Sequence, residues 1–165
     1  MPVSLVILVM GVAGTGKSLV GEKLARALGW TFREGDDFHP PANIAKMSAG
    51  IPLTDADRAP FLAGIRKEIE RCLAAGENAV IACSALREEY RRILVVDRAR
   101  VKLVHLTGDP ALIRARLSGR KGHFMKAGML DSQLAALEPP ADALALDVAA
   151  APDALVARIR VAFGL

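Results

Sequence analysis

Two hydrophobic patterns alternate along the chain: apolar runs, and segments in which apolar residues recur every three or four positions. The apolar runs predict strands over residues 3–10, 31–33, 78–83, 101–106 and 143–148. Continuous apolar runs are typical of strands in a parallel sheet, which are covered on both faces. The periodic segments predict helices over residues 18–28, 42–48, 55–75, 88–95, 110–117, 130–137 and 152–163.

Strands that alternate with helices predict an α/β fold with a parallel sheet and right-handed crossover connections. The length of 165 residues fits a single domain with room for a small lid. Ligands of such sheets bind beyond the carboxyl ends of the strands. Two polar segments, a glycine-rich loop at 11–18 and a charged segment at 34–47, fall at that edge.

The composition is that of a folded globular protein, with 52% hydrophobic and 24% charged residues. A formal net charge of +4 suits an anionic small ligand and is too weak to indicate nucleic-acid binding. The apolar run at 3–10 is too short to cross a bilayer and lacks a basic leader, so no membrane partner is expected. Cys72 and Cys83 form no metal-type pair, and a reduced, cytoplasmic location is the simplest expectation.

The glycine-rich loop reads GVAGTGKS and matches the phosphate-loop pattern G-x-x-x-x-G-K-[ST]. Glycines let successive backbone N–H groups point at one phosphate cluster, and the following helix adds its positive dipole end. Lys17 is expected to reach the β- and γ-phosphates, and the Ser18 hydroxyl to bind Mg²⁺. The residues predicted to bind the nucleoside triphosphate here are Gly11, Val12, Ala13, Gly14, Thr15, Gly16, Lys17 and Ser18.

Three classes of protein compete for this loop: GTPase switches, motor or transporter ATPases, and small-molecule kinases. The chain contains no guanine signature of the NKxD type. The strand at 78–83 runs into Ser84 rather than into the acid that the large ATPases use for Mg²⁺. A small-molecule kinase needs an acceptor pocket, a general base and a lid, and the remaining motifs supply a candidate for each.

The lid candidate lies at about 118–130, around the basic segment RARLSGRKGHFM of residues 114–125. Arg116 and Arg120 are four residues apart and share one face if the helix continues that far. Arginines stabilise the charge on a transferring phosphoryl group, best in a closed and dry site. Both are therefore candidates for nucleotide binding and Arg120 also for catalysis, with a solvated basic helix end as the alternative.

The charged segment EGDDFHPPANIAKM concentrates ionisable groups at the end of a predicted strand. An alcohol that attacks a γ-phosphate benefits from a carboxylate that orients it and takes its proton. Asp36 and Asp37 are both placed for this role. A polar turn rich in Asp, Pro and Asn is the alternative interpretation.

Four stretches of the chain, in this order, resemble the gluconokinase family of P-loop small-molecule kinases. They are GVAGTGKS, residues 35–62, CSALREEYR at 83–91, and RKGHFM with LDSQLAALEPP within 120–140. The second stretch follows the family pattern G-D-x-x-H-P-x-x-N-x-x-K-M-x-x-G-x-P-L-x-D-x-D-R-x-P-W-L. The resemblance implies a P-loop NTPase fold related to nucleoside monophosphate kinases, with a five-stranded parallel sheet flanked by helices and a small lid. It also implies phosphorylation of D-gluconate at its terminal hydroxyl by ATP with Mg²⁺, to give 6-phospho-D-gluconate.

The family pattern carries over onto matching positions and implies an acceptor-binding segment at about 36–75. The matching positions are Asp36, His39, Pro40, Asn43, Lys46, Met47, Asp55, Asp57, Arg58, Ser84, Tyr90 and Arg91. The resemblance favours Asp36 over Asp37 as the general base, or as a carboxylate that orients the acceptor through Mg²⁺-bound water.

Gluconate is an anion with a chain of hydroxyls, so its site needs a basic group and several polar groups. For Arg58, a salt bridge with Asp55 or Asp57 is the alternative role. For His123, in the lid, a structural role is the alternative. The candidates for substrate binding, besides Asp36, are His39, Lys46, Arg58, Ser84, Arg87, Tyr90, Arg91 and His123.

The chain departs from the family pattern at three positions: Phe61 replaces Trp, Arg87 replaces Lys, and Arg92 reverses the charge of a frequent Asp. Two other functions stay open at this point. One is a kinase for another small acceptor, such as shikimate or a nucleoside monophosphate, and HPPANIAKM argues against both acceptors. The other is a nucleotide-binding sensor without catalysis. A homodimer is expected only from the resemblance.

Overall fold

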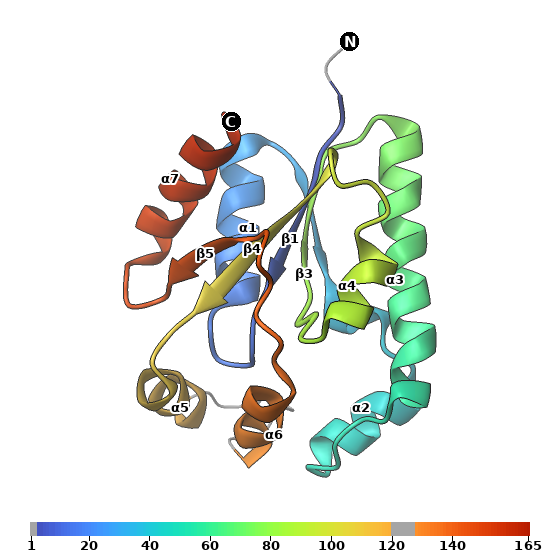
Figure 1. The fold of residues 1–165 in the computed structure, drawn as a ribbon, viewed down its shortest axis with the longest axis vertical. Helices are drawn as coiled ribbons and strands as arrows, with labels where there is room; N and C mark the ends of the chain where they lie inside the picture. The colour runs from blue at the N-terminus through green and yellow to red at the C-terminus, as the bar shows by residue number, and fades with distance from the viewer. Residues whose placement is uncertain (1–2, 120–127) are drawn as a thin grey trace.

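The computed structural model describes residues 3–119 and 128–165. Within these residues, five parallel strands form one sheet in the order β2-β3-β1-β4-β5 (Figure 1). This confirms the predicted α/β fold with a five-stranded parallel sheet. The strands are β1 (Val6–Met10), β2 (Thr31–Glu34), β3 (Ala79–Ala82), β4 (Val101–Thr107) and β5 (Leu144–Asp147).

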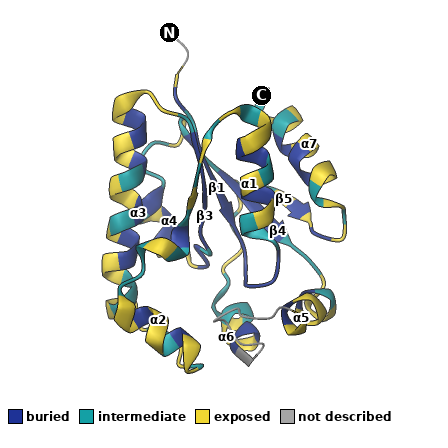
Figure 2. Ribbon diagram, turned by 180° about the vertical axis from the view of Figure 1, so that it is seen from behind, coloured by how far each residue is buried: buried dark blue, intermediate teal, exposed yellow. Residues whose placement is uncertain are grey.

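Helices cover both faces of the sheet, and their buried faces are blue in Figure 2. The helices α1 and α7 pack on one face through a cluster that includes Ile7 and Val9 of β1. On the other face, α3 and α4 pack through a cluster that includes Val6 and Leu8. The helices are α1 (Lys17–Leu28), α2 (Pro41–Ser48), α3 (Asp55–Ala75), α4 (Glu88–Leu94), α5 (Pro110–Ser118), α6 (Gly128–Ala136) and α7 (Pro152–Phe163), with a 3₁₀ turn η1 (Gly35–Phe38).

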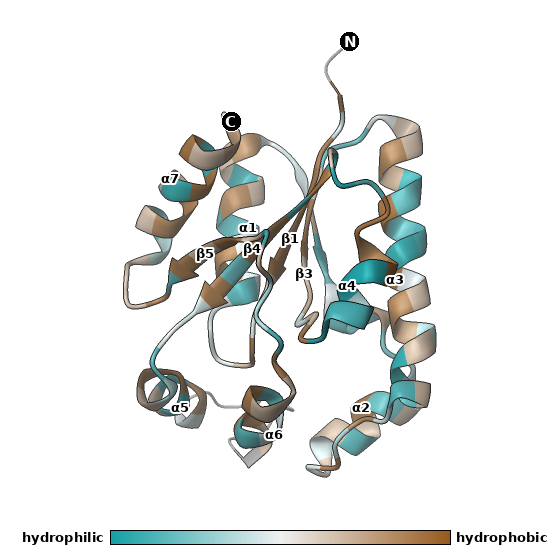
Figure 3. Cartoon of the chain, viewed as in Figure 1, coloured by the Kyte–Doolittle hydropathy of each residue, from teal (hydrophilic) through white to brown (hydrophobic). Residues whose placement is uncertain are grey.

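Hydropathy follows this layering, with apolar strands between helices that carry a polar outer face (Figure 3). All five residues of β1 are buried, as the continuous apolar run predicted. In the described part of the chain, no helix is long and apolar enough to cross a membrane.

Local signals fix where several helices begin and end. Thr54 and Asp57 form a reciprocal capping box at the start of α3, and Asp109 caps α5 ahead of Pro110. The α5 helix ends at Ser118, so the face that Arg116 and Arg120 would share on a longer helix is not described. The predicted lid at 118–130 falls largely on residues 120–127, outside the described residues.

The carboxyl ends of three adjacent strands bring the polar segments of the sequence together. The strand β3 lies between β1 and β2, and Ala82 of β3 is in register with both Val9 and Glu34. The loop after β1, η1 after β2 and Ser84 after β3 therefore start at the same level of the sheet.

Candidate active site

The loop at 11–18 wraps around the start of α1 with glycines at its tight positions. Gly11 has φ 150°, and a Cβ there would lie 2.6 Å from the backbone oxygen of Leu106. The Thr15 hydroxyl donates to the Val12 carbonyl at 2.8 Å, and Lys17 Nζ donates to the same oxygen at 3.1 Å. This geometry leads the loop directly into the positive end of α1, as phosphate binding requires.

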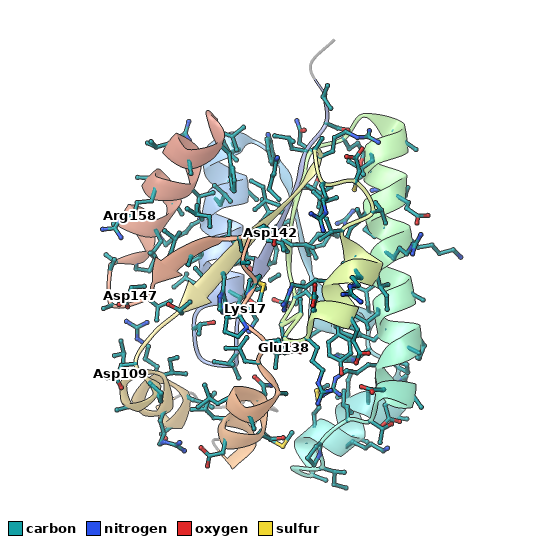
Figure 4. All side chains as sticks on the ribbon, in the orientation of Figure 1. Lys17, Asp109, Glu138, Asp142, Asp147 and Arg158 are labelled. Atoms are coloured by element: carbon teal, nitrogen blue, oxygen red, sulfur yellow. The ribbon has the colours of Figure 1, made fainter. Side chains whose placement is uncertain are left out.

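A cavity of about 780 Å³ opens beyond this loop, between the sheet edge and helices α2 to α6. Figure 4 shows Lys17 at the carboxyl ends of the central strands, on the side of α6. The predicted site residues that line the cavity are Ala13, Gly14, Thr15, Gly16, Lys17, Ser18, Asp36, His39, Arg58, Ser84, Arg87, Tyr90 and Arg116. Among the described residues, Gly11, Val12, Lys46 and Arg91 lie outside this lining. Arg120 and His123 lie outside the described residues.

Glu34, which the sequence reasoning missed, lies where the first two polar segments meet. The Ser18 hydroxyl donates a hydrogen bond to the Glu34 carboxylate, and both residues line the cavity. Burial raises the pKa of the Glu34 carboxyl, and the nearby Asp36 carboxylate acts in the same direction. The available signal was its position, one residue ahead of the G-D pair at the end of a strand.

His39 lines the same cavity as the phosphate loop. Its ring stacks on Phe61, with centroids 3.7 Å apart and an interplanar angle of 11°. Its Nε2 lies 3.8 Å from an Asp36 carboxylate oxygen. Burial lowers the pKa of His39, while Asp36 opposes and Arg58 reinforces that shift. Phe61, which stands where the family pattern has Trp, thus covers one face of the His39 ring.

Arg58 faces the cavity and is also held by protein groups. Its Nη1 donates to the Leu53 carbonyl at 2.8 Å and to the Tyr90 hydroxyl at 3.2 Å. The Tyr90 hydroxyl in turn donates to Asp55 at 2.6 Å, and Arg58 lies 3.9 Å from the same carboxylate. Of the two acids considered for a salt bridge, Asp55 is therefore the partner, and Asp57 is engaged elsewhere.

This chain is similar to known proteins over most of its length. A family model described as an AAA domain matches residues 6–140. A gluconokinase of Gluconobacter oxydans is 51% identical over 136 residues, which make up 82% of this chain and 76% of that protein. The chain belongs to the gluconokinase family.

Two solved structures place the fold of this gluconokinase-family chain among kinases. A gluconokinase from Sinorhizobium meliloti is 42% identical with a TM-score of 0.82, covering 99% of this chain and 97% of that one. A sugar kinase from Janibacter sp. HTCC2649 is 40% identical with a TM-score of 0.89, covering 96% of this chain and 93% of that one. The predicted P-loop kinase fold is confirmed.

Lys46, a predicted substrate residue, pairs with an acid of the capping box in this gluconokinase-family fold. Its Nζ lies 2.7 Å from Asp57 Oδ2, the oxygen that also accepts the Thr54 backbone N–H. The hydrogen bond from Lys46 is the largest cause that lowers the pKa of Asp57, from 3.8 to about 2. The pair ties α2 to the start of α3.

We expect Lys46→Met to lower the free energy of unfolding in a pH-dependent way and to leave the KM for gluconate unchanged. A carboxyl whose folded pKa is depressed stabilises the fold above its ordinary pKa, and loses that contribution as the pH falls through the folded value. The difference between wild type and variant should therefore be full above pH 3.8 and shrink towards pH 2. Urea unfolding midpoints across this range measure it, with Lys67→Met on the exposed face of α3 as the control. A raised KM would make Lys46 a ligand instead.

Arg91, also a predicted substrate residue, is buried with its guanidinium directed at backbone carbonyls. It donates to Ala85 O at 2.8 Å and to Glu138 O at 2.7 Å. Glu138 also accepts the backbone N–H of Glu88 at 3.1 Å, at the start of α4. Ala85 has φ 45°, a strained value for a residue with a side chain, and Arg91 holds its carbonyl. Through the Ala85 carbonyl, the guanidinium thus stabilises the backbone of residues 84–87, which line the cavity.

Gln133 of α6 is a second residue that the sequence reasoning missed. Its side-chain oxygen accepts the backbone N–H of Ala13 at 2.7 Å, so α6 reaches the phosphate loop directly. Gln133 lies within the LDSQLAALEPP stretch, which marked the family but carried no assigned chemistry. The helix α6 is therefore in contact with the phosphate loop.

Proposed function

We propose that this chain transfers the γ-phosphoryl group of ATP to the terminal hydroxyl of D-gluconate, giving 6-phospho-D-gluconate. The observation that carries the proposal is the shared cavity. The phosphate loop and the G-D-x-x-H-P segment open into one space of about 780 Å³, in a member of the gluconokinase family. Donor and acceptor can therefore meet without a rearrangement of the sheet.

The phosphate loop binds ATP in this proposal. Backbone N–H groups of residues 14–18, at the start of α1, face the phosphates, and Lys17 adds a full positive charge. Arg116 lines the cavity from α5 and is exposed, so it can approach the nucleotide from the side of the lid. These groups stabilise the charge that spreads over the transferring phosphoryl group.

The residues at this edge also fit Mg²⁺. The Ser18 hydroxyl and the Glu34 and Asp36 carboxylates supply hard oxygen donors around the cavity. Among the described residues no group of three or more His, Cys, Asp or Glu forms a cage for a metal. That donor set suits Mg²⁺, which keeps several waters and is bound by few protein groups together with substrate phosphates. When bound, the ion supplies positive charge to the β- and γ-phosphates.

Asp36 is the general base of the proposal. Its side chain is half-exposed to the cavity, within the reach of an acceptor hydroxyl. The carboxylate accepts the hydroxyl proton as the acceptor oxygen forms its bond to the γ-phosphorus and the bond to the ADP oxygen breaks. The polyol chain of the substrate contacts polar groups of Ser84, Tyr90 and His39. The proposal also includes a cytoplasmic location and a homodimer.

An assay that couples ADP release to a panel of acceptors tests the proposed function. The panel contains gluconate, other sugar acids, shikimate and nucleoside monophosphates, each with ATP and Mg²⁺. ADP release with gluconate alone supports the proposal. ADP release with another acceptor would contradict gluconate as the substrate and would still support a kinase. No ADP release with any acceptor would favour a nucleotide sensor without catalysis.

The basic wall of the cavity gives a prediction about the gluconate carboxylate. We expect Arg58→Ala and Arg87→Ala each to raise the KM for gluconate about 10- to 100-fold, because a hydrogen bond to a charged group contributes roughly 1.5–3 kcal/mol. Arg92→Ala on α4 is the matched control, since Arg92 is exposed and pairs with Glu88 at 3.4 Å. Steady-state kinetics at saturating ATP measure the effect. An unchanged KM in both cavity variants would remove these arginines from the carboxylate site.

A further inference from the structure

We propose that Asn43 is a positioning residue that fixes the tautomer of His39, so that the neutral ring presents its Nε2–H to an acceptor hydroxyl beside Asp36. The role in catalysis rests on the proposed function. The tautomer itself is a property of the free protein and can be measured without any substrate.

The orientation of the Asn43 amide is determined by a backbone carbonyl. Asn43 is buried in α2, with 3% of its surface exposed. Its Nδ2 lies 2.8 Å from the carbonyl oxygen of Asp57. A carbonyl can only accept a hydrogen bond, so the Asn43 atom that faces it must be the NH₂ group. The amide cannot turn over without placing two oxygens against each other.

The second hydrogen of the same NH₂ group points at the imidazole ring. Asn43 Nδ2 lies 3.1 Å from His39 Nδ1. Because this nitrogen donates, Nδ1 must accept, and the ring proton is carried by Nε2. Protonation of Nδ1 would set two donors against each other within a buried contact. Asn43 therefore holds His39 both neutral and in one tautomer.

The packing around the ring directs Nε2–H toward the reaction site. The side chain of His39 is 5% exposed, and its ring is stacked on Phe61. Asp36 lies 3.8 Å from Nε2, a separation too long for a hydrogen bond. An acceptor hydroxyl oxygen beside Asp36 could accept from Nε2–H while its own proton faces the carboxylate.

This arrangement gives the two side chains separate roles. The charged groups that face the ring are Asp36 from η1 and Arg58 from α3, of opposite sign. A neutral donor orients the acceptor oxygen without placing a positive charge beside the base, where it would weaken the base as a proton acceptor. His39 then orients the hydroxyl and Asp36 accepts its proton.

Nitrogen-15 NMR of the histidine rings in the nucleotide-free protein tests the tautomer. We expect the His39 ring, assigned by its loss in His39→Gln, to show a protonated Nε2 and an unprotonated Nδ1 at pH 7. In Asn43→Asp the new carboxylate accepts from Nδ1–H, so the Nδ1 resonance should move to its protonated position. Ala42→Asp, which adds the same charge on the exposed face of α2, should leave the ring unchanged.

Activity supplies the second arm of the experiment. We expect Asn43→Asp to lower kcat/KM for gluconate about 10- to 100-fold. A Gln side chain can place its amide N–H near the position of Nε2, whereas Asn places it near Nδ1, so His39→Gln should retain more activity than His39→Asn. An Nδ1–H tautomer in wild type, or equal activity of the two His39 variants, would overturn the proposal. If the acceptor panel fails while the NMR result holds, only the proposed substrate is wrong.

Discussion

We expect Asp36→Asn to lower kcat for gluconate phosphorylation about 10²- to 10⁴-fold, the range that a positioned general base contributes. The amide keeps the size of the side chain and can still hydrogen-bond to the acceptor, but it cannot take the hydroxyl proton. Binding of ATP without Mg²⁺ should change little, because the phosphate loop, and not this carboxylate, faces the phosphates in the proposed complex. Single-turnover kinetics at saturating ATP and gluconate measure the loss, and a fluorescent nucleotide titration checks ATP affinity.

The neighbouring acid provides the control. Asp37 is exposed and does not line the cavity, so Asp37→Asn should stay within a few-fold of wild type. The pair separates a general base from a general effect of negative charge at this strand end. Near-normal turnover in Asp36→Asn would rule out the base, and equal losses in both variants would point to the local charge instead.

The fold could be predicted because its signals are local. The run VILVM is buried throughout β1, and a glycine in the left-handed region ends α1, α3 and α7. The charged residues at the strand ends also predicted the location of the site, because parallel strands place their carboxyl ends at one edge of the sheet. Boundaries moved by a few residues, as for β1, which begins at Val6 rather than residue 3.

The partners of long charged side chains could not be predicted from the sequence. Lys46 and Arg58 lie in the same motif, yet Lys46 turns to Asp57 and Arg58 faces the cavity. Arg91 reaches the carbonyl of Glu138, which is 47 residues away in the sequence. Such side chains have several rotatable bonds, so their contacts depend on tertiary packing that a motif does not encode. Glu34 was missed for the same reason, because its partner Ser18 lies at the start of α1, 16 residues away in the sequence.

The glycine of the G-D pair makes the second large prediction, and its reason is a close approach of two backbones. A Cβ at Gly35 would lie 2.2 Å from the carbonyl oxygen of Ala82 in β3. No rotamer change relieves this contact, because the backbone of residue 35 fixes the Cβ position and the oxygen belongs to the backbone of Ala82. In Gly35→Ala, η1 must lift away from β3 and carry Asp36 with it.

We expect Gly35→Ala to lose about 1–3 kcal/mol of unfolding free energy, as overpacked sites do. We also expect kcat for gluconate to fall roughly 10²-fold, because a displacement of a catalytic group by about 1 Å costs that much. Urea unfolding and steady-state kinetics measure the two effects on the same sample.

The matched control is Gly29→Ala, which separates stability from geometry. Gly29 has φ 68° with open space around its Cβ position, so an alanine there is strained without touching anything. It should cost about 1–2 kcal/mol of stability and leave kcat unchanged. If Gly35→Ala matched this control, the approach of η1 to β3 would have no part in placing Asp36. A loss of kcat in Gly35→Ala but not in Gly29→Ala would instead show that the close approach of residue 35 to β3 determines the position of Asp36.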